Sequence, residues 1–414
     1  MAQAQLLADN EGKFCMTIST SVTPVYDITA LRRDEFPLTE VVTYLNHAGI
    51  SPLPERSRRA TQYTIDHMAH NASKFFGTDG IPMLERFHHE LKAYINAEHA
   101  SDICPVQSNS LAFNLVAGAI DWRRGDNIIF CDVEFPANAY PWMALERQGV
   151  TCKIIPPQHG TLTVEALDAA VDQNTRLVAV SSLQFFTGAR ADLVALGAYC
   201  RERDILFSVD AIQSVGHIPI DVQAMNIDIL ACGGQKSLLA LTGIGFLYIR
   251  PEVAEQMQPS FVGANNVEGW EHWLKYDMTP RQGALRFMTG TFNVPGIFTV
   301  VSSLSLINEL GVHHIDAYTT QLAGHFMDEL DARGYEILTP RDPALHGPIV
   351  TFKAAETSEE TDRIVKYLAD HEIPTVKHLD AEGHPFLRLS LHCYNNQQDS
   401  ARFFEYLSSA AQPS

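Results

Sequence analysis

Two apolar runs, each ending at a chemically reactive side chain, constrain this chain more than any other feature. Residues 205–209 are almost all apolar and stop at Asp210, and residues 227–231 lead through a Cys-Gly-Gly-Gln turn to Lys236. Such runs are typical of buried strands in a parallel sheet. Because side chains that follow the carboxyl ends of parallel strands face one crevice, we expect Asp210 and Lys236 to meet there.

A carboxylate and a lysine in one dry crevice are suited to carbonyl chemistry. A lysine forms an imine only as the free amine, so burial and nearby positive charge must first lower its pKa. The plainer alternative is that Lys236 is a solvated lysine after a glycine turn and that Asp210 caps a helix. The residues around the two side chains favour the chemical interpretation.

Those flanking residues resemble a known motif. Asp210 begins Asp-Ala-Ile-Gln, Lys236 ends Gly-Gly-Gln-Lys, and residues 242–245 read Thr-Gly-Ile-Gly. The combination resembles the pyridoxal-phosphate (PLP) motif of the class V aminotransferase family, which includes cysteine desulfurases, kynureninase and isopenicillin N epimerase-like proteins. The resemblance implies that Lys236 holds PLP as a Schiff base. It also implies that Asp210 faces the pyridine nitrogen and that Gln213 reaches the phenolic oxygen of the ring.

The order of predicted elements agrees with this family. Strands alternate with helices, which predicts an α/β fold of the fold type I PLP-dependent transferases, with a mostly parallel central sheet and a smaller C-terminal α+β domain. We expect a helical stretch at 54–98 and a long helical pattern at 297–333. The expected domains are an N-terminal arm and first strand that pack on the small domain (1–45), a large PLP-binding domain (46–295), and a bridging helix with the small domain (296–414).

Short polar residues precede the apolar helix that begins near residue 111. Ser108, Asn109 and Ser110 are N-cap residues first, but a helix N-terminus also suits a phosphate. The family usually has Gly-Thr-Thr here, so the resemblance implies that these three residues bind the PLP phosphate, with Gln235 as a further hydrogen-bonding partner. Residues 286–291 resemble a motif whose threonine reaches the phosphate in the neighbouring subunit. This implies a homodimer completed by Thr291, although a plain loop threonine would look the same.

An aromatic residue occupies the position where the desulfurase branch stacks a histidine on the cofactor. Residues 132–136 read Asp-Val-Glu-Phe-Pro, so Phe135 takes that place. A phenyl face can cover the PLP ring but cannot move a proton. Core packing is the alternative role for Phe135.

Four further residues are candidates for substrate binding. Arg388 lies on a strand (386–392) that alternates apolar and polar side chains, and the family resemblance makes it the clamp for the substrate carboxylate. A surface arginine on a half-exposed strand is the alternative. Asn46 and His47 lie in a Tyr-Leu-Asn-His-Ala-Gly segment that resembles a pocket-lining segment of the family or is simply a strand ending in a turn. Gln184 follows a predicted strand on the crevice side.

The sequence also restricts the reaction. Cysteine desulfurases carry a nucleophilic cysteine on the loop before the arginine strand, and residues 375–385 contain His378 and His384 but no cysteine. We therefore expect aminotransfer, or epimerisation or racemisation, at the α-carbon of an amino acid. The alternative is a PLP-dependent β-lyase, either a C–S lyase or a kynureninase-like enzyme. A non-catalytic PLP-fold binding protein is disfavoured because Asp210, Gln213, Lys236 and Arg388 are all present.

Composition bears on partners and location. The formal net charge of −19 argues against nucleic acid as a partner. No segment reaches the about 18 uninterrupted apolar residues of a membrane helix, and residues 1–15 do not resemble a secretory signal. The seven cysteines are scattered, and no spacing indicates a metal site. These features predict a cytoplasmic protein whose partners are an amino acid and a second copy of itself, with no metal, membrane or nucleic acid.

Overall fold

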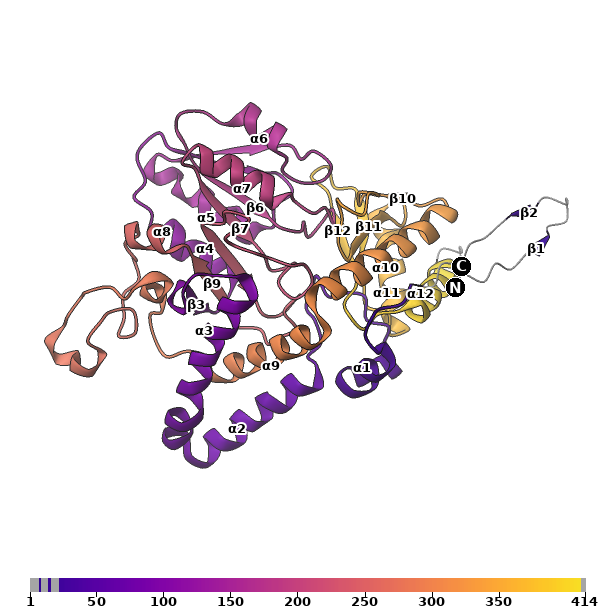
Figure 1. Ribbon diagram of the computed structural model, residues 1–414. Coiled ribbons are helices and arrows are strands. Elements are labelled where there is room, and N and C mark those ends of the chain that lie inside the picture. The colour runs from indigo at the N-terminus through magenta and orange to yellow at the C-terminus, as the bar shows by residue number, and fades with distance from the viewer. Residues whose placement is uncertain (1–6, 9–13, 16–21, 411–414) are drawn as a thin grey trace.

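A seven-stranded sheet forms the centre of the larger part of the protein (Figure 1). The structure is a computed structural model and describes residues 7–8, 14–15 and 22–410, so most of residues 1–21, the first part of the predicted arm (1–45), lie outside the described residues. The strand order is β3-β9-β8-β7-β6-β4-β5, and only β9 runs antiparallel to its neighbours. This confirms the predicted mostly parallel α/β sheet. The strands are β3 (Ile103–Val106), β4 (Asn127–Cys131), β5 (Thr151–Ile155), β6 (Thr175–Ser181), β7 (Leu206–Asp210), β8 (Ile229–Gly233) and β9 (Gly245–Ile249).

Helices cover both faces of this sheet, which explains why its strands are almost continuously apolar. In β7, Phe207 and Val209 belong to a core shared with α3, α7 and α9, whereas Ile229 and Ala231 of β8 belong to a core shared with α4 and α5. Alternate side chains of a strand point to opposite faces, so both faces need apolar residues. The helices are α2 (Glu55–Phe75), α3 (Ile81–Ile95), α4 (Asn109–Ala117), α5 (Tyr140–Met143), α6 (Val164–Ala170), α7 (Leu193–Glu202), α8 (Pro251–Gln256) and α9 (Val294–Leu310).

The long helical pattern at 297–333 is two helices. It breaks at Gly311, between α9 and α10 (Val312–Ala332), and the two helix axes differ by 77°. Gly311 has φ +80°, a left-handed conformation that glycine adopts without strain. α2 packs along α9 beneath the sheet (Figure 1). Among the described residues, no helix alone combines the length and hydropathy that crossing a membrane requires; only the bent α9–α10 pair does so jointly.

A second, antiparallel sheet forms the smaller part of the protein. Its order is β10-β11-β13-β12, with β10 (Glu336–Ile337), β11 (Ile349–Lys353), β12 (Val376–Leu379) and β13 (Pro385–Ser390). Leu387 and Leu389 pack into a core with α10, α11 (Ser358–Asp370) and α12 (Gln397–Ala410), so Arg388 lies on the opposite face. A capping box formed by Thr357 and Glu360 starts α11.

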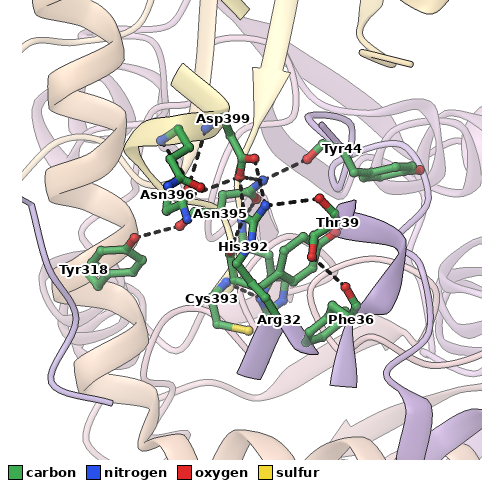
Figure 2. A network of polar contacts seen from close by, with 12 residues as sticks. Arg32, Phe36, Thr39, Tyr44, Tyr318, His392, Cys393, Asn395, Asn396 and Asp399 are labelled. Carbon is green, nitrogen blue, oxygen red and sulfur yellow. Dashed lines mark hydrogen bonds and ion pairs between the residues drawn. The ribbon is translucent and has the colours of Figure 1, made fainter. Parts of the chain in front are cut away.

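Residues 22–46 lead from the small sheet to the site. They contain α1 (Ile28–Glu35) and a 3-10 turn (Pro37–Glu40), and a polar network ties them to the residues that follow β13 (Figure 2). Arg32 donates to Asp399 (2.9 Å) and to the Tyr394 carbonyl (2.9 Å), and Asn395 donates to the Tyr44 carbonyl (3.0 Å). Residues 22–46 form no strand, and their one β-bridge joins Asn46 to Ser390. The remaining two-residue strands, β1 (Leu7–Ala8) and β2 (Phe14–Cys15), pair with each other.

Candidate active site

The sheet brings Asp210 and Lys236 to one edge. Asp210 is the last residue of β7, and Lys236 follows the end of its parallel neighbour β8. Both side chains are buried. Burial and the positive charge of Arg388 together lower the pKa of Lys236 to about 8, against the opposing effect of Asp210. Burial also raises the pKa of Asp210. The amine is therefore partly deprotonated near neutral pH, as imine formation requires.

The turn after Asp210 fixes the backbone beside Lys236. The Ser237 hydroxyl donates to the carbonyls of Ile212 (2.8 Å) and Val215 (2.7 Å). Gly216 has φ +107°, and a Cβ atom there would lie 2.1 Å from the Ser237 carbonyl oxygen. The two segments thus approach so closely that only glycine fits at position 216.

The N-terminus of α4 contacts the carboxylate. The Asn109 amide donates to Asp210 (2.6 Å), which also accepts from the Ile212 N–H (3.0 Å). Ser108 is the N-cap, since its hydroxyl accepts from the Leu111 N–H (3.2 Å), and Ser110 is exposed. The three residues predicted to bind phosphate therefore differ in their contacts: the Asn109 side chain supports Asp210, Ser108 caps α4, and Ser110 is exposed.

The segment that contains Asn46 lies across the same edge. Gln213 donates to the Ala48 carbonyl (3.1 Å), and the Ser51 N–H donates to the Gln235 carbonyl (2.8 Å). Among the described residues, the buried side-chain oxygen of Asn46 has no hydrogen-bond partner. Asn46 thus carries an unsatisfied acceptor on this segment, and Gln213 keeps part of its hydrogen-bonding capacity free.

Phe135 lies beside the lysine. Its side chain is 39% exposed, the Lys236 Nζ is 5.0 Å from its ring centroid, and Phe185 packs edge-on against it at 5.1 Å. The preceding residue, Glu134, was missed by the sequence analysis. Its buried carboxylate accepts from the Ser181 N–H (2.8 Å) and from the Gln184 amide (2.6 Å), so Gln184 holds this turn on the end of β6.

Arg388 is a buried cation that has no ionic partner among the residues the structure describes. Its side chain is on β13 and is 3% exposed, its Nη1 donates to the Phe185 carbonyl (2.8 Å), and its Nε has no partner. Burial lowers its pKa to about 10. A buried charge is costly when unpaired, so this guanidinium is suited to an anionic ligand. His378, opposite Phe386 in the β12–β13 pair, lies nearby, and burial together with Arg388 and Lys236 lowers its pKa to about 4.

The other histidines lie elsewhere. His384 is exposed and bonds Asp380 (2.8 Å), with which it shares an exposed turn. His47 is buried, bonds the Ser51 hydroxyl (2.9 Å) and packs against His392 (5.1 Å between centroids), so its ring contacts are with a buried cluster behind the site. The third member is His217, which stacks on His392 at 3.7 Å. No local sequence pattern predicts this cluster, because its members come from three separate segments.

His392 has a defined tautomer. Its Nδ1 accepts from the Cys393 N–H (2.8 Å; Figure 2), so Nε2 carries the hydrogen and donates to the Ser237 carbonyl (2.9 Å). Burial lowers its pKa to about 4. The neutral ring therefore supports the residue next to Lys236.

Thr291 lies apart from the lysine. It is exposed and lines a cavity of about 140 Å³ together with Gln107, Leu111 and Gly243. Its role in a neighbouring subunit stays a prediction.

Comparisons with known proteins agree with this arrangement. The profile of the family described as Aminotransferase class-V matches residues 43–403. The chain is 27% identical over 390 residues to a probable cysteine desulfurase of Methanothermobacter thermautotrophicus, which covers 89% of this chain and 94% of the relative. It is 28% identical over 367 residues to the uncharacterized aminotransferase YcbU of Bacillus subtilis, with the same shares of each chain.

Solved structures show the same fold. A cysteine desulfurase from Thermococcus onnurineus superposes with a TM-score of 0.83 at 23% identity, covering 94% of this chain and 99% of the other. The cystine C-S lyase C-DES gives 0.83 at 22% identity, covering 92% and 100%. The fold, with its lysine, carboxylate and buried arginine, defines a PLP-dependent enzyme of fold type I. The chain belongs to the aminotransferase class-V family, which confirms the predicted family and cofactor.

Proposed function

We propose that this enzyme acts at the α-carbon of an amino acid, by aminotransfer or by epimerisation or racemisation. One observation carries the proposal: a buried amine, Lys236, lies in the electrostatic field of a buried carboxylate, Asp210, and an unpaired buried guanidinium, Arg388. The pKa of about 8 for Lys236 suits a group that must lose and regain a proton near neutral pH.

The residues present fit PLP. Asp210 would face the ring nitrogen, held by Asn109, and the exposed face of Phe135 would cover the ring. The first turn of α4, from Ser108 to Ser110, and Gln235 would hold the phosphate, and Gln213 would reach the phenolic oxygen. When bound, PLP supplies an electron acceptor for the bond that breaks at the α-carbon.

Four side chains of the enzyme have separate roles toward the substrate. Arg388 binds the substrate carboxylate, which satisfies its unpaired Nε and compensates its buried charge. Lys236 removes or returns the α-proton as the general base. Asn46 accepts a hydrogen bond from the substrate through its unpartnered side-chain oxygen, and Gln184 keeps the Phe135 turn in place from below.

Sulfur transfer through a cysteine is not supported, although relatives carry the name cysteine desulfurase. Such a step needs an accessible thiolate. Every cysteine in residues 22–410 is buried or half-buried, and burial raises the pKa of each thiol. Cys393, the one nearest Arg388 in sequence, is fully buried. Loss of a β-substituent remains the second candidate, because it needs only the same proton removal by Lys236.

The proposed homodimer is supported by the surface near Thr291. The segment at 261–278 exposes large apolar side chains, among them Phe261, Trp273, Leu274 (87% exposed) and Tyr276. Patches of this kind mark protein interfaces. In a dimer, Thr291 would complete the partner's phosphate site. Sedimentation of the purified protein tests this, and a monomer at micromolar concentration would contradict it.

Absorption spectroscopy tests the cofactor proposal. The purified protein should show a visible band that Lys236→Ala alters, while the matched variant Lys353→Ala on the small sheet keeps it. A preparation that stays colourless with added PLP would contradict the proposal. Products of an amino-acid panel then separate the reactions: keto acid indicates aminotransfer, loss of chirality with solvent deuterium at the α-carbon indicates epimerisation or racemisation, and ammonia with pyruvate indicates β-elimination.

A further inference from the structure

A continuous row of rings joins the lysine to the arginine. Phe135 packs edge-on against Phe185 (5.1 Å between centroids, 81°), and Phe185 packs edge-on against His378 (5.5 Å, 83°). Phe186 continues the row by contacting His378 (6.2 Å) and Phe386 (5.6 Å). We call these five residues the aromatic wall. It starts beside the Lys236 amine and ends on the strand that carries Arg388.

The aromatic wall is not part of the cores that hold the sheets together. Within the described residues, none of its members belongs to a hydrophobic core cluster. Phe185, Phe186 and His378 are half-buried and Phe135 is exposed, whereas Phe386 is buried and closes the far end of the wall. The ring surfaces of the first four therefore remain available to a ligand, which is unusual for large apolar groups beside a buried lysine and arginine.

The middle of the wall is held rigidly. The Phe185 carbonyl accepts from Arg388 (2.8 Å), and the Phe186 carbonyl accepts from the Thr351 hydroxyl (2.6 Å). Thr351 and Arg388 are direct partners in the β11–β13 ladder, so both bonds come from one position of the small sheet. A surface fixed in this way binds a flat group without first having to be ordered.

The surface of the wall opposes an ionic side chain. Burial, together with the positive charges of Arg388 and Lys236, lowers the pKa of His378 to about 4 and keeps its imidazole neutral at physiological pH. A substrate lysine or arginine would lose its hydration against the phenyl rings and this neutral imidazole. An anionic side chain would lose its hydration against phenyl rings, with the single unpartnered Nε2 of His378 to replace it.

We propose that the preferred substrate is an amino acid with an uncharged aromatic side chain, which packs against Phe185 and His378 while Arg388 holds its carboxylate. This inference rests on the proposed function, because it requires the amino group at Lys236 and the carboxylate at Arg388. With the amino group at Lys236 and the carboxylate at Arg388, the substrate's side chain would lie against the aromatic wall. Phe185 is then the principal specificity-determining residue.

Titration of the PLP-loaded enzyme tests the inference through the visible band of the bound cofactor. Phenylalanine, tyrosine and tryptophan should give apparent dissociation constants at least about 10-fold below those of alanine, aspartate and lysine. Phe185→Ala should raise the apparent dissociation constants of the aromatic amino acids by about 3-fold to 10-fold and leave that of alanine unchanged. The matched control is Tyr367→Ala, which removes a half-buried ring from α11 and should preserve the order of preference.

The outcomes separate this inference from the function on which it rests. If alanine or a charged amino acid binds most tightly, or if Phe185→Ala keeps the aromatic preference, the substrate class is wrong while the proposed function stands. If the enzyme binds PLP and no amino acid changes its band, or if it binds no PLP, the proposed function itself is wrong. Should Phe185→Ala fail to fold, Phe185→Leu keeps the volume and removes the ring, and the same loss of preference is expected.

Discussion

Acid should destabilise this protein through His392, and replacing that residue should reduce the effect. The pKa of His392 is lowered by burial to about 4, whereas an unfolded histidine titrates near about 6.5. Between these values the unfolded chain binds a proton that the folded chain does not. The stability that the neutral ring contributes is therefore complete above pH 6.5 and is lost as the pH falls toward 4.

The magnitude follows from the two pKa values. At pH 5, protonation of this histidine in the unfolded chain lowers the free energy of unfolding by about 2 kcal/mol. Each pH unit below 6.5 contributes about 1.4 kcal/mol to this loss. His392→Gln keeps a donor for the Ser237 carbonyl but cannot titrate. We expect the free energy of unfolding of this variant to fall by about 2 kcal/mol less than that of the wild type between pH 7.5 and pH 5.

Urea unfolding midpoints at each pH, with saturating PLP in every sample, measure this difference. His88→Gln is the matched comparison, because burial also lowers the pKa of His88 to about 4 but its place on α3 is outside the site. It should flatten the pH dependence similarly and leave the visible band of bound PLP unchanged. If the free energy of unfolding of wild type and of His392→Gln depends on pH in the same way, the reasoning is refuted, because the neutral His392 ring would then not stabilise the fold.

Three further variants probe the site. Arg388→Met should weaken amino-acid binding by about 30-fold or more, because a buried charged hydrogen bond is lost. It should also raise the pKa of Lys236, because a nearby positive charge is removed, so the acid limb of the pH–rate profile should move to higher pH. Asn109→Ala should cost about 1–3 kcal/mol in unfolding free energy because Asp210 loses a buried donor, and an unchanged urea midpoint would contradict this. Gly216→Ala should lower the melting temperature, since its Cβ would meet the Ser237 carbonyl, whereas Gly334→Ala has open space around it and tests the backbone strain alone.

Some parts of the site could be predicted because they follow local rules. Strands that end at Asp210 and near Lys236 are apolar on both faces, so their parallel pairing and shared edge can be inferred from the residues alone. The face of β13 that carries Arg388 follows from the alternation of its side chains. The bend at Gly311 was missed because the apolar pattern continues across it, although the glycine was the available signal.

Other parts depend on contacts between distant segments. Glu134 gives no sign in the sequence that its carboxylate anchors Gln184 and Ser181, because those residues lie on another strand. His47 was a candidate for substrate binding, yet its ring packs into a buried cluster. Side-chain direction in a turn is set by tertiary packing, which no local pattern records.

The sequence by itself determined the class of this protein and its cofactor, because the strand pattern and the motif spacing are local properties of the chain. Only the tertiary structure decided what surrounds those residues. It left Arg388 buried without an ionic partner, turned Asn109 toward Asp210 and joined Phe135, Phe185 and His378 from three segments into one wall. Burial, charge compensation and ring packing depend on residues far apart in the chain, and they become definite only when the sheets bring those residues together.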